Sequence, residues 1–434
     1  MRPVYIIDGV RTPFVKSGSE FADVPAQQLG RAALRELIDR VAVDPATLDE
    51  IIIGNVAGPA DATNVARVIA LLAGVPESVP AYSVNRNCAS GIQSVADAAL
   101  RIAAGQAELV VAGGAESMSM VPVFYPESFK KKLFGMAKSR TPVARAAKAM
   151  SLRPHDFNPV IALEVGLTDD TCGLNMGQTA ELLAREFGIT REAQDKFALR
   201  SHERAARADE LGHLAGEIAP FPVPPDYKQL VRQDQGPRPN QTLEKLAALK
   251  PYFDRKYGTV TVGNSCQVTD GAAMLLLASE DAAAKLGRPI LGRIRSWAFA
   301  GLDPRRMGLG PAHAVPKALE KAGLRLADME LIEFNEAFAA QVLANAAAFD
   351  SIEFARRHLG GTRPIGTLDF DRTNVNGGAI ALGHPVGATG SRLVLTLLKE
   401  MSRRHLGLGL VTLCVGGGQG AAMILERTTK STGG

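Results

Sequence analysis

The chain has 434 residues, of which 46% are hydrophobic and 22% are charged, and its formal net charge is +4. This length and balance are typical of a globular protein of two or three domains that can bury a large core. The small positive charge gives no support to a nucleic-acid partner, and the apolar runs are too short or too interrupted to span a bilayer.

Short apolar runs alternate with longer alanine- and leucine-rich runs along the chain. The runs rich in β-branched residues predict buried strands, and the amphipathic runs predict helices. We expect strands at residues 4–7, 51–54, 109–112 and 410–413, and helices at 28–41, 91–104, 179–187, 191–209 and 391–401. Strands that alternate with helices indicate an α/β fold with mixed sheets.

The chain also contains a weak internal repeat. In each half, a turn-like junction opens a helix of small residues, which is followed by a strand and a glycine-rich turn. This unit starts at Cys88 in the first half and at His384 in the second. Because any α/β protein repeats such units, the pattern alone leaves open whether the domain is duplicated.

The middle of the chain differs in texture, with proline-rich stretches at 220–225 and 237–239. We interpret it as a loop domain inserted into the first half. The predicted division is an N-terminal half at residues 1–121 and 262–287, an inserted domain at 122–261 and a C-terminal half at 288–434.

The four cysteines are far apart, and they form neither a C-x-x-C pair nor a cluster at zinc spacing. We therefore expect no disulfide framework and no metal site, and we expect a reducing compartment, the cytoplasm. The first residues enter an apolar run at once, without the pattern of a signal or transit peptide, which agrees with that expectation.

Cys88 stands in a turn-like stretch that leads into an apolar helix. A thiol at a helix N-terminus faces unpaired N–H groups and the positive end of the helix dipole, which favour the thiolate. The small residues Ala89, Ser90 and Gly91 are expected to let a substrate approach the sulfur. Taken alone, the segment fits an inert buried cysteine equally well.

His384 lies in the glycine-rich stretch 374–390, which implies close packing of the backbone and a fixed imidazole. A histidine held near a cysteine can take the thiol proton and remain as an imidazolium partner. A lone histidine is usually structural, but this glycine-rich setting favours a functional one.

Two further segments carry candidate groups. Cys414 ends a predicted strand before the turn 416–420, whose N–H groups can form an oxyanion hole, although an ordinary buried cysteine is the alternative. Asn335 and Glu336 lie among apolar residues and need buried partners. The Asn335 amide suits a water held against an oxyanion, but on its own the position favours a helix N-cap.

Together these segments resemble the signature motifs of the thiolase family, in the order that the family shows. The motifs are spread over essentially the whole chain, at residues 87–91, 113–119, 335–338, 376–390 and 414–420, and residues 11–14 and 263–273 also resemble the family. The resemblance implies a five-layered αβαβα core made of two similar mixed-sheet halves, with a loop domain over the active site.

The resemblance also implies roles for individual residues. Cys88 would be the nucleophile, His384 its base and Cys414 a second acid and base. Asn335 would hold the water of one oxyanion hole, and the N–H groups of Cys88 and Gly416 would form the other. Met176 and Phe338 match positions that touch the pantetheine arm in the family, and Cys266, also expected to contact the substrate, stands where many members have a small hydroxyl residue near that arm. No metal or redox cofactor is implied, because coenzyme A is a substrate.

The implied activity is thiolytic cleavage of 3-ketoacyl-CoA in fatty-acid β-oxidation. A biosynthetic acetoacetyl-CoA thiolase is the close alternative, and a thiolase-like lipid-binding or scaffold protein without activity is a third. Asn175 and Phe334 stand where small-substrate members often have a histidine and a smaller residue, which favours the degradative enzyme. The family implies a homodimer or homotetramer that binds acyl-CoA and CoA.

The segment from Phe129 to Arg153 carries eight lysines and arginines and no acidic residue. Apolar residues recur at helical spacing on either side of Pro142, which predicts two short basic amphipathic helices. Such helices suit a membrane surface or a partner. The segment resembles the extended loop of the thiolase subunit in fatty-acid oxidation complexes, which implies a hydratase/dehydrogenase subunit as that partner. A solvated loop that attracts CoA phosphates is the alternative.

Overall fold

The structure is a computed structural model that describes residues 2–428. Five strands of the first half form one side of a mixed sheet: β1 (Tyr5–Arg11), β3 (Glu50–Gly54), β4 (Ala81–Val84), β5 (Leu109–Glu116) and β10 (Thr269–Ala278). They lie in the order β4-β3-β5-β10-β1, with β3 parallel to β4 and β5, and β10 antiparallel to β5 and β1. The expected strands of this half are confirmed.

The second half repeats this arrangement. Its strands are β11 (Gly292–Gly301), β12 (Leu331–Phe334), β13 (Leu408–Val415) and β14 (Gln419–Glu426), in the order β12-β13-β14-β11 and with matching directions. Thr373 forms a parallel bridge to Ile332 at the place that β4 takes in the first half. β1 and β11 join the halves into one continuous sheet. The weak sequence repeat is therefore a duplicated structural unit.

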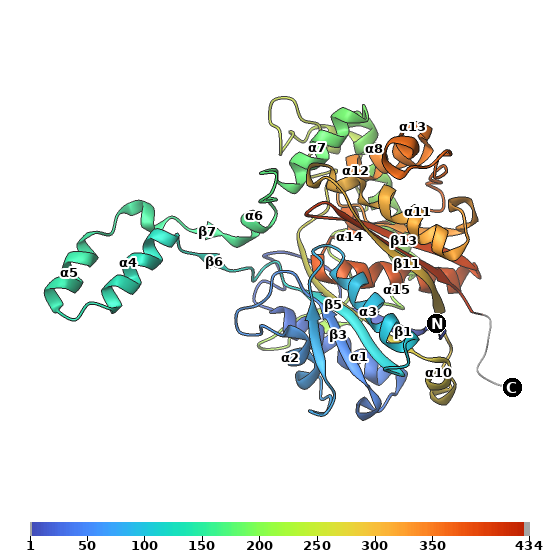
Figure 1. Ribbon diagram of the computed structural model, residues 1–434, viewed down its shortest axis with the longest axis horizontal. Coiled ribbons are helices and arrows are strands. Elements are labelled where there is room, and N and C mark those ends of the chain that lie inside the picture. The colour runs from blue at the N-terminus through green and yellow to red at the C-terminus, as the bar shows by residue number, and fades with distance from the viewer. Residues whose placement is uncertain (1, 429–434) are drawn as a thin grey trace.

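Helices cover both faces of each half and complete the five layers (Figure 1). α1 (Ala26–Val41) and α2 (Val65–Leu72) pack on the outer face of the first half. α3 (Ser90–Ala103) and α15 (Val386–Arg404) lie between the halves, and α11 (Gly310–Ala322) and α12 (Ala339–Asp350) cover the outer face of the second. The expected five-layered α/β fold is confirmed.

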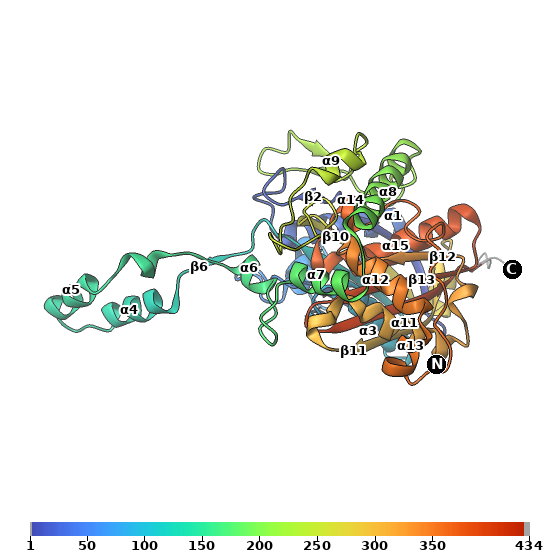
Figure 2. The same ribbon diagram turned by 90° about the horizontal axis from the view of Figure 1, so that it is seen from above.

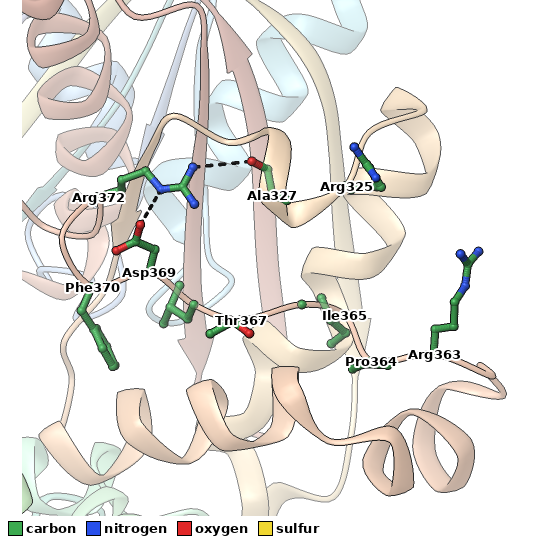
Figure 3. A pocket seen from close by; sticks show the side chains of 11 residues that line it. Arg325, Ala327, Arg363, Pro364, Ile365, Thr367, Asp369, Phe370 and Arg372 are labelled. Carbon is green, nitrogen blue, oxygen red and sulfur yellow. Dashed lines mark hydrogen bonds and ion pairs between the residues drawn. The ribbon is translucent and has the colours of Figure 1, made fainter.

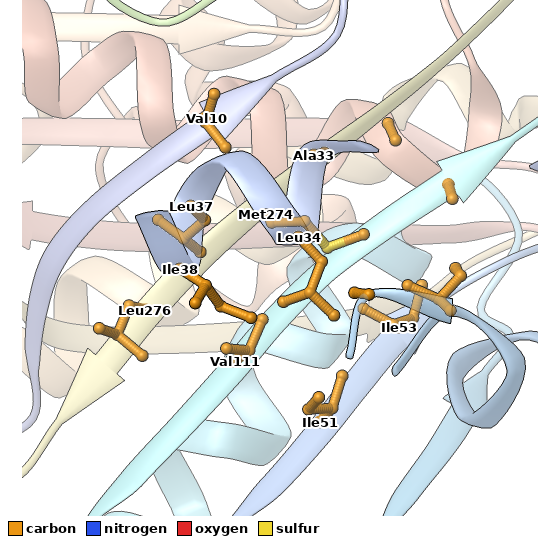
Figure 4. Packing of buried hydrophobic residues seen from close by; sticks show 14 of the residues in the cluster. Val10, Ala33, Leu34, Leu37, Ile38, Ile51, Ile53, Val111, Met274 and Leu276 are labelled. Atoms are coloured by element: carbon orange, nitrogen blue, oxygen red, sulfur yellow. The ribbon is translucent and has the colours of Figure 1, made fainter. Parts of the chain in front are cut away.

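Alternate residues of one strand pack against different helix layers, which explains why the apolar runs in the sequence are continuous. Ile51 and Ile53 of β3 pack with α1 in the cluster that Figure 4 shows, whereas Ile52 faces the central helices. A strand that is buried on both faces must be apolar at every position.

The two central helices approach each other through glycines. A Cβ atom at Gly390 of α15 would lie 2.3 Å from the backbone nitrogen of Ile92, and one at Gly91 of α3 would lie 2.7 Å from that of Ser391. Only glycine allows this contact. The expectation that Gly91 leaves room for a substrate is therefore wrong, because Gly91 leaves room for the opposite helix.

Two helices begin before their expected first residues, because a side-chain cap or tertiary packing sets where each helix starts. α7 (Met176–Glu186) starts three residues early, because Asn175 and Gln178 form a capping box. α15 starts five residues early and includes two glycines, since its packing against α3 outweighs their poor helix propensity. α8 (Arg191–Glu210) lies close to its expected position.

The segment between β5 and β10 contains the helices α4 to α9, including α6 (Ala162–Gly166) and α9 (Leu243–Ala247), and its α7 and α8 pack against the second half. Its basic part forms an arm, defined here as residues 122–162. The two predicted helices are confirmed as α4 (Glu127–Ala137) and α5 (Pro142–Met150), separated near Pro142. A two-strand ribbon of β6 (Val123–Phe124) and β7 (Val160–Ile161) connects them to the body, from which they project (Figures 1 and 2).

None of the helices within residues 2–428 has both the length and the apolar character that crossing a bilayer requires.

Candidate active site

Cys88 lies in the turn between β4 and α3. Asn87 adopts a φ of 43°, a left-handed conformation that asparagine tolerates better than most residues. The Cys88 side chain is partly buried and packs against the apolar core between the two halves. Burial raises the pKa of the Cys88 thiol, and the N–H groups of Gly416 and Cys88, which reach the sulfur, offset only part of this rise. Cys88 is therefore a thiol at rest and needs a base, contrary to the expectation of a thiolate.

A glycine turn brings the second half to this sulfur. Gly417 and Gly418 have φ values of 85° and 75°, which glycine adopts without strain. The turn is held by Asn87, whose side-chain Nδ2 donates to the carbonyl oxygen of Gly416 at 2.8 Å. This bond between the halves aims the Gly416 N–H at Cys88. The left-handed Asn87 was missed in the sequence, where an asparagine beside a cysteine is a weak signal.

His384 is buried at the start of α15. Its backbone N–H donates to the carbonyl oxygen of Gln267 at 3.1 Å, which places it beside the Cys266 segment. Burial, with a smaller contribution from Arg392, lowers the pKa of His384 to about 4. The imidazole is neutral near pH 7 and free to accept a proton. Nε2 is buried and has no hydrogen-bond partner within residues 2–428.

Cys414 and Cys266 lie close to Cys88. Burial raises the pKa of Cys266 to about 12 and that of Cys414 well above its ordinary value, and in both cases the neighbouring Cys88 adds to the rise. Electrostatic coupling of this kind requires short distances in a poorly hydrated site. The structure therefore brings three thiols from distant segments together.

The predicted substrate contacts Met176 and Phe338 pack in the same apolar cluster as Cys414. Phe253 of the inserted segment joins this cluster, with its ring centroid 5.9 Å from that of Phe338. Phe253 could not be singled out from the sequence, because a single aromatic residue in a loop-rich region has no pattern. These apolar side chains surround the Cys414 thiol and are suited to contact the uncharged part of a substrate.

Asn335 is fully buried, and neither atom of its side-chain amide has a partner within residues 2–428. Its backbone N–H donates to Thr412 of β13 at 2.9 Å, next to the strand end that carries Cys414. The reading as a helix N-cap is wrong, since α12 begins at Ala339 and Phe338 takes the cap position. A buried, unpaired amide at a strand end is well suited to hold a water or a ligand oxygen.

Two buried carboxyl groups hold the backbone around these residues. Glu336 accepts hydrogen bonds from the side chains of Ser201 at 2.6 Å and Asn374 at 2.7 Å. Glu116, at the end of β5, accepts one from the N–H of Gly387 at 2.9 Å. The segments on both sides of His384, and the residue that follows Asn335, are thereby fixed to the scaffold.

Two positions taken as indications of substrate size have other roles. Phe334 is fully buried on the outer side of β12, where its ring lies 6.4 Å from that of Phe349. Asn175 caps α7, accepting from the N–H of Gln178 at 2.9 Å. Phe334 packs in the outer core rather than over the thiols, so its size carries no information on the acyl chain.

A cavity of about 800 Å³ lies elsewhere, on the outer side of the second half (Figure 3). Three arginines line it, and Arg372 is held by Asp369 at 2.9 Å. The predicted site residues are absent from its lining. The converging thiols, rather than this cavity, therefore define the candidate active site.

Comparison with known proteins agrees with the geometry. The model of the thiolase N-terminal domain matches residues 4–281, and that of the thiolase C-terminal domain matches residues 288–427. The chain is 44% identical to a 3-ketoacyl-CoA thiolase of Serratia proteamaculans over 424 residues, which cover 98% of this chain and 96% of the relative.

Among solved structures, human mitochondrial 3-ketoacyl-CoA thiolase in complex with CoA is similar, with a TM-score of 0.85 and 38% identity over 99% of this chain and 98% of the other. Bacillus anthracis acetyl-CoA acetyltransferase has a TM-score of 0.86 and 37% identity over 99% of both chains. The chain belongs to the thiolase family.

Proposed function

We propose that this enzyme is an acetyl-CoA C-acyltransferase that cleaves 3-ketoacyl-CoA with free CoA, giving acetyl-CoA and an acyl-CoA shortened by two carbons. The observation that carries this proposal is the meeting of Cys88 and Cys414 in one poorly hydrated site, beside the N–H of Gly416. The chemistry needs one thiol to hold the acyl group and a second acid and base to move protons at carbon and sulfur.

In the first half-reaction, His384 takes the proton of Cys88, and the sulfur attacks the 3-keto carbon. The N–H groups of Cys88 and Gly416 stabilise the oxyanion that forms on the keto oxygen. The C2–C3 bond then breaks, and its electron pair leaves with the acetyl-CoA fragment as an enolate. The amide of Asn335, through a water, and His384 stabilise the enolate oxygen, and Cys414 protonates the carbon.

In the second half-reaction, the acyl chain is a thioester on Cys88. The thiol of a new CoA molecule gives its proton to Cys414 and attacks the thioester carbon. Cys88 leaves as a thiolate, recovers its proton from His384, and the shortened acyl-CoA departs. The reaction transfers an acyl group and protons without net oxidation or reduction, and side chains of the site supply each proton donor and acceptor, so we propose that no metal or redox cofactor takes part.

A series of kcat/KM values with 3-ketoacyl-CoA substrates of increasing chain length tests this proposal. A degradative enzyme is expected to prefer medium or long chains over acetoacetyl-CoA. The reverse order would favour the biosynthetic thiolase, a function supported by the structural similarity to an acetyl-CoA acetyltransferase. Absence of turnover together with failure of iodoacetamide to label Cys88 would instead favour a binding or scaffold protein.

We further propose that the enzyme is a homodimer or homotetramer in the cytoplasm. β4 is an edge strand, and the exposed Leu71, Leu72 and Leu100 belong to α2 and α3 beside it, so this edge is suited to pairing with a second copy. The four free cysteines suit a reducing compartment. A monomeric mass in light scattering would contradict the assembly.

The arm supports a proposal about location within the cell. No side chain of α4 or α5 is buried, and the apolar Phe134, Val143 and Met150 are more than half exposed. Basic side chains surround them, and of the eight lysines and arginines from Phe129 to Arg153 only Lys130 and Lys132 form an ion pair with an acidic side chain. Basic helices with exposed apolar residues bind anionic lipid surfaces through charge and shallow insertion. We propose that the arm docks the enzyme on such a surface.

Co-sedimentation with phosphatidylglycerol-containing vesicles checks this. Wild type is expected to bind, and Lys130, Lys131 and Lys138 changed together to glutamate should lose more than about 10-fold in affinity. The control carries the same charge change on the body, at Lys196, Lys228 and Lys285, and should still bind. If wild type does not bind vesicles but co-purifies with a hydratase/dehydrogenase subunit, the arm binds a partner protein instead of a lipid surface. If it binds neither vesicles nor such a subunit, the docking proposal fails.

A further inference from the structure

Thr389 makes the one side-chain hydrogen bond that His384 has within residues 2–428. Thr389 lies one turn into α15 and is fully buried. Its Oγ1 lies 2.6 Å from Nδ1 of His384 and 3.0 Å from the carbonyl oxygen of Pro385. The sequence motif around His384 contains this threonine, but the proposed reaction assigns it no role.

The direction of these two bonds follows from counting protons. The hydroxyl group has a single proton, and the Pro385 oxygen can only accept. If the hydroxyl donates to Pro385, it must accept from His384, so the imidazole proton is on Nδ1 and both contacts are hydrogen bonds. If the hydroxyl donates to His384 instead, the bond to Pro385 is lost and the imidazole proton moves to Nε2.

The surroundings of Nε2 distinguish these two states. Nε2 is buried and has no partner among the described residues. A buried N–H without an acceptor is costlier and rarer than an acceptor without a donor. The state with the proton on Nδ1 therefore satisfies one more hydrogen bond and leaves a lone pair, rather than an orphaned proton, on Nε2.

We propose that Thr389 is a positioning residue that fixes the tautomer of His384, with the proton on Nδ1 and the lone pair of Nε2 directed to the reacting groups. This inference rests on the proposed function, in which His384 takes the proton of Cys88. The Thr389 hydroxyl would also accept from Nδ1–H when His384 becomes an imidazolium, so it supports both states of the base through the cycle.

Thr389→Val tests the inference, because valine keeps the shape of threonine and removes the hydroxyl. We expect kcat for thiolysis to fall by about 10- to 100-fold, since a buried Nδ1–H loses its acceptor, while KM for CoA changes by less than about threefold. Thr389→Ser restores the hydroxyl and should recover kcat to within about fivefold of wild type. A role in packing alone would predict the opposite order, because serine also lacks the methyl group.

Thr396→Val is the matched control. Thr396 is a buried threonine two turns further along α15, and its Oγ1 donates to Glu217 at 3.1 Å, away from His384. Its loss should leave kcat within about twofold of wild type, even where the melting temperature falls. The melting temperature of each variant shows that differences in rate do not come from unfolding.

The rate of Cys88 alkylation by iodoacetamide separates this inference from the proposed function. We expect alkylation at neutral pH to be about 10-fold slower in Thr389→Val than in wild type, because thiolate formation depends on His384. If wild type lacks thiolysis but this difference persists, the proposed function fails and the role of Thr389 stands. If folded Thr389→Val keeps wild-type kcat and alkylation, or Thr389→Ser is as impaired as Thr389→Val, the inference is overturned.

Discussion

Replacement of Cys88 by alanine is expected to lower turnover of 3-ketoacyl-CoA by more than about 10⁴-fold, because the nucleophile is lost from both half-reactions. The neighbouring thiols are poor substitutes. Burial raises the pKa of all three thiols, to about 12 for Cys266 and well above the ordinary value for Cys414, and only at Cys88 does the N–H of Gly416 offset part of the rise. Only Cys88 combines access to substrate with donors for an oxyanion.

Two measurements check this expectation. Thiolysis is followed by the loss of 3-ketoacyl-CoA absorbance, and the intact protein is weighed by mass spectrometry after incubation with 3-ketoacyl-CoA in the absence of free CoA. Wild type should gain one acyl group and Cys88→Ala none. Cys172→Ala, which removes a partly buried thiol outside the site, should keep turnover within about twofold of wild type. An acyl adduct on Cys88→Ala would show that another residue is the nucleophile.

The fold follows from the sequence to the extent that local patterns dictate it. Apolar runs that are buried on both faces, such as Ile51–Ile52–Ile53 of β3, have few alternatives to a covered strand. The glycines around His384 predict close backbone contact, and Gly390 confirms it with the opposite helix. What these patterns leave undetermined is which surface each glycine meets, as the misinterpretation of Gly91 shows.

The site is less predictable, because its contacts join segments that are far apart in the sequence. Asn87 holds Gly416 across the two halves, and Phe253 reaches Phe338 from the inserted segment. Neither contact has a local signal. At Asn335 the local signal points the wrong way, since its neighbours favour a helix cap, while the tertiary structure places it at the end of a strand beside β13.

The charge state of Cys88 shows the same conflict between local and global effects. The start of a helix favours a thiolate, and the nearby N–H groups act in that direction. Burial acts in the other direction and is stronger, because desolvation depends on everything that packs around the sulfur. At neutral pH, Cys88 is therefore a thiol and His384 is a neutral imidazole, which are the starting states that the proposed proton transfer requires.

Loss of Cys414 should also reduce thiolysis strongly, but by removing a proton donor and acceptor instead of the nucleophile. Its thiol is buried in an apolar cluster, and burial keeps its pKa well above the ordinary value. A weak acid of this type can protonate an enolate, which is a strong base, and its thiolate can take the proton back from CoA. Cys414→Ala is therefore expected to lower thiolysis by about 10²- to 10⁴-fold, as for the loss of a general acid and base.

Acylation of Cys88 by a simple acyl-CoA should survive in this variant, because the proton that His384 takes from Cys88 can return to the departing CoA sulfur. The mass of the intact Cys414→Ala protein should therefore still rise by one acyl group. Exchange of the C2 hydrogens of acetyl-CoA in deuterium oxide should be lost, since this exchange needs the base at carbon. Cys266→Ala, which removes the other nearby thiol, should retain the exchange and change mainly KM. If Cys414→Ala exchanges these hydrogens at the wild-type rate, a different residue moves the proton at carbon. If the variant loses both the exchange and the acylation, Cys414 shapes the site around Cys88 instead of moving the proton.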